Sequence, residues 1–280
     1  MKVRVLTGVG IFLVGLPLLL FSKYLVFPIV LGILAAMAVW EVLRVFSLHK
    51  KYELTIPACL VALAMPIFTH TIFFDSQEQN KYLLLLALVL FVFLIYLVFL
   101  SVFSKGRMEF GSVSSVFTMV VYVTASFSAL GLLRYMELGA YTFGLVFVAA
   151  WVCDTFAYFT GRLFGKHKLI PELSPKKTVE GSIGGMAFAV IGFVVYGLIM
   201  QFCFELKVNY LTLCLSGLLL SVVSQLGDLF ASLIKREHGA KDYSQLLPGH
   251  GGIMDRFDSI LAVSAVFMII CQVFPPFSVA

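Results

Sequence analysis

The chain has 280 residues, of which 61% are hydrophobic and 12% are charged, and its formal net charge is +5. Because soluble globular domains carry about 25% charged residues, this composition excludes an ordinary soluble protein and predicts an integral membrane protein. The apolar runs are long enough to cross a bilayer as helices and lack the alternation of barrel strands. Helices are the remaining spanning structure, so the predicted fold class is all-α and polytopic.

Taken in chain order, nine apolar segments are candidate transmembrane helices. The first follows a short basic N-terminus, but no small-residue cleavage site comes after it, so we expect a retained helix rather than a signal peptide. The third contains Pro57 and Pro66, which can kink a helix. The expected spans are 5–21, 24–43, 54–74, 82–103, 112–133, 140–163, 182–203, 210–231 and 259–276.

The basic residues predict the orientation of these spans. When the nine spans are threaded in turn, all but four of the 20 Lys and Arg residues fall on one side of the membrane. By the positive-inside rule, that side is cytoplasmic. We therefore expect the N-terminus in the cytoplasm, the C-terminus outside, and the polar loops 162–181 and 233–258 in the cytoplasm. The four exceptions are Lys23, Lys81, Arg134 and Lys207.

Polar residues concentrate in the C-terminal half of the chain. We expect residues 1–135 to be membrane helices that serve mostly as scaffold, and residues 136–280 to form a catalytic membrane domain with the two polar loops. The five cysteines lie in or beside apolar runs and show no CxxC spacing. They are interpreted as small hydrophobic residues, without a disulfide framework or a metal-ligand set.

The sixth span carries Asp154, Tyr158 and Arg162 at helical spacing, so these side chains share one face. Asp154 lies about 12 Å along the axis from Arg162, from the helical rise per residue. A carboxylate at this depth could be a metal ligand, a substrate contact or a partner for an arginine, and the sequence leaves these alternatives open.

The loop that follows begins with a glycine- and lysine-rich stretch, 161–168, that superficially resembles a phosphate-binding P-loop. One residue is missing between the glycines, His167 replaces the hydroxyl residue, and no strand precedes it, so a P-loop is rejected. Orientation and attraction to anionic lipid explain most of the lysines. They do not explain segment 174–181, Ser-Pro-Lys-Lys-Thr-Val-Glu-Gly, in which Lys176 and Lys177 are candidate substrate-binding residues.

The eighth span presents a polar stripe on one helix face. A charged residue inside the bilayer costs about 2.5–3.5 kcal/mol unless it finds partners, so Asp228 needs an explanation. It could bond to a neighbouring helix or pair with an arginine. Because the stripe continues into a cationic loop, a metal ligand is favoured. The stripe contains Ser221, Ser224, Gln225, Asp228 and Ser232.

Loop 233–258 brings together cations, carboxylates and a Gly-His-Gly-Gly turn, 249–252, whose backbone amides could approach an anion closely. Asp255 and Asp258 could simply cap the ninth helix, but both beside Arg256 are more than a cap requires. Asp228 and Asp255 could together hold Mg²⁺, with substrate phosphates completing its shell. Charged residues of the loop include Lys235, Arg236, Lys241, Asp242, Asp255, Arg256 and Asp258.

Segment 232–258 resembles, over its full length, the signature of phosphatidate cytidylyltransferases (CDP-diacylglycerol synthases). That signature is S-x-apolar-K-R, then K-D, then P-x-H-G-G-apolar-x-D-R-apolar-D, and each element is present here. Segment 174–181 and the stretch from Asp154 to Tyr158 also look like motifs of this family. The resemblance covers about residues 150 to 260, whereas the first five spans match only as generic membrane helices.

The resemblance implies transfer of CMP from CTP to phosphatidate, with Mg²⁺ and with K⁺ as a second cation. It implies a multi-pass protein of the cytoplasmic (inner) membrane, with membrane lipid as a partner, a cytoplasmic active site, a homodimer and no nucleic acid. Asp228 and Asp255 match the metal-binding carboxylates. The implied catalytic residues are Asp228, Asp255, Lys235, Arg236 and Asp258. The expected substrate-binding residues are Ser232, Lys241, His250, Gly251, Gly252, Arg256, Asp154, Lys176 and Lys177.

A transporter and two other enzymes of CTP or lipid chemistry are alternatives. A transporter of phosphorylated lipid or anions would use buried carboxylates along a pathway, but the chain lacks paired repeats and its polar features gather at one surface. A CTP-using lipid kinase or an isoprenoid-ether cytidylyltransferase would share much of the chemistry. His250 is expected to bind phosphate rather than act as a base, because a phosphate monoester has a second pKa of about 6 and is already ionised.

Overall fold

The computed structural model describes residues 22, 24–74, 79–104, 108–249 and 251–279. Within these residues, eight helices are long and apolar enough to cross a membrane, which confirms the all-α, polytopic fold class. The first expected span, 5–21, lies outside the described residues, so the count of nine stays a prediction. Seven of the eight are α2 (Val26–Val45), α3 (Tyr52–Phe74), α4 (Gln79–Phe103), α5 (Phe110–Tyr135), α9 (Val179–Phe204), α10 (Tyr210–Glu237) and α11 (Met254–Val273).

The remaining spanning helix, Gly139–Phe164, is built from four consecutive segments. The π-helical segment ends just before Asp154. Such wide turns are rare and occur frequently at functional sites. The helix therefore changes its winding beside the carboxylate that the sequence singles out. The segments are α6 (Gly139–Thr142), α7 (Gly144–Phe147), the π-helix η1 (Val148–Val152) and α8 (Cys153–Phe164).

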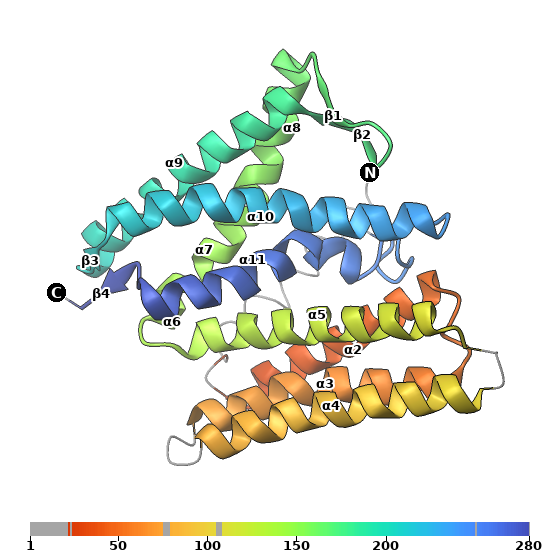
Figure 1. The fold of residues 1–280 in the computed structure, drawn as a ribbon. Coiled ribbons are helices and arrows are strands. Elements are labelled where there is room, and N and C mark those ends of the chain that lie inside the picture. Colours follow the sequence, from red (N-terminus) through yellow and green to blue (C-terminus); the bar gives the residue numbers. More distant parts are fainter. Residues whose placement is uncertain (1–21, 23, 75–78, 105–107, 250, 280) are drawn as a thin grey trace. The chain divides into compact units, whose positions relative to one another are not determined.

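Four short strands complete the described elements. β1 (Lys168–Ile170) and β2 (Ser174–Thr178) form an antiparallel hairpin between α8 and α9, visible at the top of Figure 1. β3 (Lys207–Val208) pairs antiparallel with β4 (Phe277–Ser278). The expected loop 162–181 is therefore largely ordered, with Lys176 and Lys177 in strand β2.

The second expected loop is also shorter than 233–258. Helix α10 continues to Glu237, so Lys235 and Arg236 form its last turn, where positive charge is favourable against the helix dipole. Helix α11 begins at Met254 and includes Asp255 in its first turn. The connection between the two helices thus covers only residues 238–253.

The chain divides into two compact units, here called the first and second unit. The first contains residues 1–132 and 240–256, and the second contains residues 133–239 and 257–280. Within the first unit, α3 packs against both α2 and α4. Within the second unit, α9 packs against both α8 and α10. The expected division into residues 1–135 and 136–280 stays a prediction.

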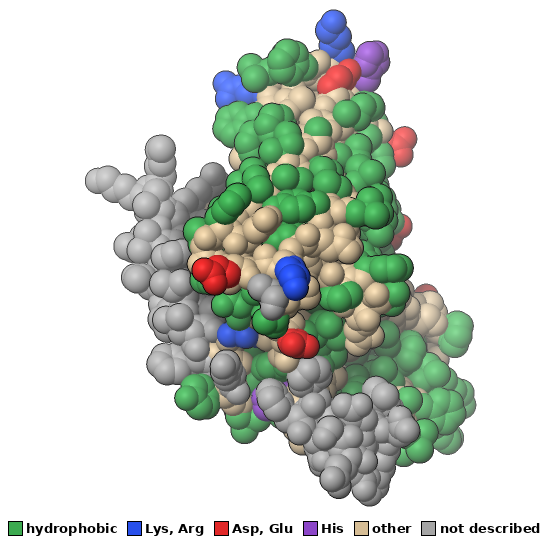
Figure 2. Space-filling model, turned by 90° about the vertical axis from the view of Figure 1, so that its left-hand side faces the viewer, with side chains coloured by type: hydrophobic (Ala, Val, Ile, Leu, Met, Phe, Trp, Pro, Cys, Tyr) green, Lys and Arg blue, Asp and Glu red, His purple; other side chains and the backbone are tan. Residues whose placement is uncertain are grey.

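Large apolar side chains remain exposed on these helices, as expected where the surroundings are lipid. Phe202 is 77% exposed and Leu211 is 71% exposed. Hydrophobic side chains cover much of the face drawn in Figure 2, with few charged side chains among them. This surface agrees with an integral membrane protein.

A glycine sets the approach of two helices beside the candidate site. A Cβ at Gly227 of α10 would lie 2.8 Å from both the carbonyl oxygen of Asp258 and the Cβ of Ala262 on α11. Neither of these atoms can move away without shifting the helix. The absence of a side chain at Gly227 therefore lets α10 and α11 come together next to Asp228 and Asp258.

Candidate active site

Three carboxylates from three different helices come together in the second unit. Asp154 lies on α8, Asp228 on α10 and Asp258 on α11. Asp228 is close enough to interact electrostatically with both of the others. Like charges gathered in this way destabilise one another unless cations accompany them.

Two lysines supply that positive charge. The Nζ atom of Lys177 lies 2.5 Å from Oδ2 of Asp228, and the two side chains are 23% and 29% exposed. Lys177 also interacts with Asp154. Lys235, which is buried, interacts with Asp258. The structure thus joins the predicted residues of α8, β2, α10 and α11 into one charged cluster.

Local hydrogen bonds explain how strand β2 delivers Lys177 to this cluster. Thr178 caps helix α9, because its hydroxyl oxygen accepts the backbone N–H of Gly181 at 3.1 Å. The carboxylate of Glu180 accepts the backbone N–H groups of Lys166 and His167 and lies 2.7 Å from Nδ1 of His167. These bonds attach the hairpin to the first turn of α9 on both sides of Lys177.

A second set of bonds links the helices below the carboxylates. The hydroxyl of Ser182 on α9 donates to Oε1 of Gln225 on α10 at 2.5 Å. The amide nitrogen of Gln225 lies 3.5 Å from Sγ of Cys153 on α8. Ser221 instead donates to the carbonyl of Leu218 within its own helix. The polar stripe of α10 is therefore used partly for helix packing.

In the first unit, a carboxylate that sequence reasoning did not select organises the signature segment. Glu41 of α2 is fully buried and accepts the hydroxyl of Ser244 and the backbone N–H groups of Ile253 and Met254. The only signal in the sequence is an acidic residue inside an apolar span, the same signal that singles out Asp228.

Asp255 binds backbone groups of the loop that precedes its helix. Its Oδ2 atom accepts the backbone N–H of Tyr243 at 2.8 Å and that of Gly252 at 3.0 Å. The backbone N–H of Gly251 donates to the carbonyl of Leu247. The amides of both glycines are therefore engaged within the chain. Because Asp255 accepts N–H groups that precede α11, its expected role as a cap of the ninth helix stays a prediction. Its predicted role as a metal ligand stays a prediction.

The remaining predicted residues differ in accessibility. Lys176, Arg236, Lys241 and Arg256 are exposed, and Ser232 is partly buried. His250 lies outside the described residues. Asp228 and Asp255 belong to different units, so the expected pairing of these two carboxylates stays a prediction.

The side chains of the cluster offer oxygen donors for the implied Mg²⁺. Among the described residues, no group of three or more His, Cys, Asp or Glu side chains is arranged to hold a metal ion. However, Asp228 already faces one cation, Lys177. Carboxylate oxygens are the ligands Mg²⁺ prefers, and this ion is usually bound by one or two carboxylates together with substrate phosphates and waters. Asp228 and the carboxylates near it therefore fit a Mg²⁺ ion that enters the site together with a nucleotide.

The fold and this charged cluster define an integral membrane protein with grouped carboxylates and lysines. A family model described as "Cytidylyltransferase family" matches residues 2–274. The chain is 36% identical over 272 residues to a phosphatidate cytidylyltransferase of Bacillus subtilis, and the alignment covers 94% of each chain. It is 37% identical over 263 residues to one of Staphylococcus epidermidis, covering 94% of this chain and 96% of the relative.

A phosphatidate cytidylyltransferase of Staphylococcus haemolyticus is 35% identical over 265 residues, with 94% of this chain and 96% of the relative covered. The matched region includes the membrane helices of both units as well as the signature segment. The chain therefore belongs to the cytidylyltransferase family. It is an enzyme of the nucleotidyltransferase class.

Proposed function

We propose that this enzyme transfers CMP from CTP to phosphatidate, giving CDP-diacylglycerol and pyrophosphate. Family membership supports the use of CTP, and the names of the relatives support the lipid substrate. One observation supports the assignment of this reaction to particular residues. It is the cluster of the second unit, in which Asp154, Asp228 and Asp258 meet Lys177 and Lys235.

In the proposed reaction, a phosphate oxygen of phosphatidate attacks the α-phosphorus of CTP in line. A new phosphorus–oxygen bond forms, the bond between the α- and β-phosphates breaks, and pyrophosphate leaves with the electron pair. The attacking phosphate has a second pKa of about 6 and is largely ionised near pH 7. No strong general base is then needed.

The main obstacle is the repulsion between two polyanions. Two unit charges 4 Å apart repel by about 4 kcal/mol at an effective dielectric constant near 20. Lys177 and Lys235 would reduce this repulsion from within the cluster. The signature residues Lys241 and Arg256 are proposed to bind phosphate groups, as the family resemblance implies.

Asp228 is the proposed ligand of Mg²⁺, and the resemblance adds Asp255 as a second ligand and K⁺ as a second cation. When bound, Mg²⁺ would neutralise phosphate charge and stabilise the leaving pyrophosphate. The oxygen donors of the cluster support this assignment, because they suit a hard cation.

We also propose that the active site opens to the cytoplasm, on the inner face of the bacterial membrane. The distribution of Lys and Arg over the predicted loops supports this orientation. A homodimer and bound membrane lipid are proposed from the family resemblance. Light scattering of the purified protein in detergent would test the dimer, and labelling of single cysteines placed at Lys176 would test the orientation.

The reaction is tested with purified protein in liposomes that contain phosphatidate and are supplied with Mg²⁺. CTP labelled at the α-phosphate should pass its label to the lipid fraction, while pyrophosphate is released. Transfer of a γ-phosphate label to lipid would instead identify a kinase. Uptake of label into the liposomes without chemical change would identify a transporter, and either result would contradict the proposal.

A further inference from the structure

Glu41 is a buried carboxylate that the proposed chemistry does not use. It lies in α2, a helix long and apolar enough to cross a membrane, and it is 0% exposed. An ionisable residue in such a helix is costly unless it is paired, and it marks a functional site by default. Its hydrogen-bond partners all belong to segment 240–256 of the same unit.

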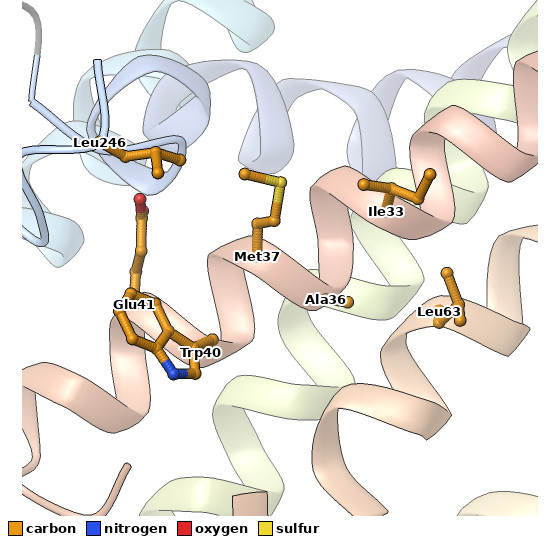
Figure 3. Close-up of a pocket in the computed structure, with 7 residues that line it drawn as sticks. All are labelled: Ile33, Ala36, Met37, Trp40, Glu41, Leu63 and Leu246. Atoms are coloured by element: carbon orange, nitrogen blue, oxygen red, sulfur yellow. The ribbon is translucent and has the colours of Figure 1, made fainter. Parts of the chain in front are cut away.

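Both oxygens of this carboxylate are used. Oε1 accepts the hydroxyl of Ser244 at 2.6 Å and the backbone N–H of Ile253 at 2.9 Å, and Oε2 accepts the backbone N–H of Met254 at 2.8 Å. Figure 3 shows the side chain of Glu41 directed from α2 toward the segment that carries Leu246. One side chain thus holds the beginning and the end of segment 244–254.

The neighbouring turn is shaped to receive this carboxylate. A Cβ at Gly252 would lie 2.6 Å from the carboxyl carbon of Glu41, so no larger residue fits there without displacing it. Asp255 accepts a hydrogen bond from the backbone N–H of Gly252. Glu41 and Asp255 therefore accept three consecutive N–H groups where α11 begins. In this structure, the missing side chain at Gly252 leaves room for the carboxylate of Glu41.

Beside these bonds, the stem of Glu41 lines a cavity of about 270 Å³. Its other walls are apolar side chains of α2 and α3 and Leu246. A water molecule in this cavity would find few polar partners, so it would be a poor replacement for the carboxylate of Glu41. Removing the carboxylate would leave the two backbone N–H groups without an acceptor, which is more costly than losing a bond at an exposed site.

We infer that Glu41 is a positioning residue for nucleotidyl transfer. It fixes segment 240–256, and with it the signature residues Lys241 and Asp255, in one conformation from a helix near the other end of the chain. This inference rests on the proposed function, because it assigns the held segment to substrate binding. A residue needed only for folding would change stability without changing turnover in the folded protein.

The test compares Glu41→Gln with Glu53→Gln in full-length protein in liposomes. Glutamine keeps the size of glutamate, but one carboxylate oxygen becomes an NH₂ group that donates and cannot accept, so one backbone N–H loses its partner. Glu53 is exposed at the start of α3 and provides the matched control. Two quantities are measured: amide hydrogen exchange of the peptide 243–255, and kcat and KM for CTP.

In Glu41→Gln, the backbone amide hydrogen of Ile253 or Met254 should exchange about tenfold faster, as expected on loss of a hydrogen bond to an ionised acceptor. The kcat of this variant should fall by about tenfold or more, and Glu41→Asp should restore part of this loss. Glu53→Gln should match the wild type in both measurements. Unchanged exchange, or faster exchange with an unchanged kcat, would overturn the inference.

Two further comparisons keep the test decisive. Gly252→Ala should remove most of the turnover in the wild type but have a smaller added effect in Glu41→Ala, because the clash disappears with the carboxylate. If Glu41→Gln does not fold, Ser244→Ala removes a single bond, and its folded protein should show a few-fold loss of kcat. Equal, additive effects in the first case or full activity in the second would contradict the inference.

Failure of the proposed function would look different. A wild type that does not transfer the α-phosphate label of CTP to lipid contradicts the proposed reaction, and the assigned role of Glu41 falls with it. An active wild type whose Glu41→Gln variant behaves like Glu53→Gln contradicts only the positioning role.

Discussion

Replacing Asp228 with asparagine separates the charge of this residue from its size. In the structure, the change removes an attraction to Lys177 across 2.5 Å and repulsions with Asp154 and Asp258. These terms have opposite signs, and the ion pair is partly exposed, so we expect the free energy of unfolding to change by about 1 kcal/mol or less. Stability alone would therefore not reveal the role of Asp228.

Turnover should respond far more strongly. A group that stabilises charge in the transition state typically contributes about 2.7–4 kcal/mol, or about 100- to 1,000-fold in rate. We expect Asp228→Asn to lower kcat/KM by at least about 100-fold. The assay follows pyrophosphate release from CTP and phosphatidate in liposomes, together with thermal unfolding of the same preparation.

Glu237→Gln provides the control for loss of one negative charge from the same helix, because Glu237 is exposed in the last turn of α10. It should leave turnover within about threefold of the wild type, as is usual for a surface substitution. A folded Asp228→Asn protein with turnover close to that of this control would refute the proposed role of the carboxylate cluster.

Three further predictions concern the same unit. Lys177→Gln should raise KM for CTP by tenfold or more, because it removes a cation from the cluster; an unchanged KM in steady-state kinetics would contradict this. Thr178→Ala should lower the free energy of unfolding by about 1 kcal/mol, because it removes the cap of α9; thermal unfolding measures this. Gly227→Ala should destabilise by about 1–3 kcal/mol and reduce turnover, because α10 and α11 must separate near Asp258; full activity would argue against the close approach seen here.

The helices could be predicted from the sequence because a membrane-length apolar run has few alternatives to a spanning helix. The polar ends of the helices were harder to predict. The eighth predicted span ended at residue 231 and the ninth began at 259, whereas α10 reaches Glu237 and α11 starts at Met254. Hydropathy detects the apolar middle of a helix, but the ends depend on bonds such as those from Ile253 and Met254 to Glu41, which form only in the folded protein.

The candidate site was predicted in part. Asp154, Asp228 and Asp258 were each selected from position and charge, and the structure adds that all three share one unit with Lys177 and Lys235. The hairpin that carries Lys177 was not predicted, because its strands are short and depend on bonds to α9. Glu41 carries the same signal as Asp228, an acidic residue inside an apolar span, but its partner lies 203 positions away, and no local pattern records such a contact.

Metal binding by Asp228 together with the nucleotide is the central feature of the proposed site. Mn²⁺, which favours the same oxygen ligands as Mg²⁺, can be titrated into reconstituted protein in the presence of CTP and followed by electron paramagnetic resonance. We expect saturable, CTP-dependent Mn²⁺ binding in the wild type and binding at least tenfold weaker in Asp228→Asn, with Glu237→Gln unchanged. Equal Mn²⁺ affinity in the wild type and folded Asp228→Asn would contradict it.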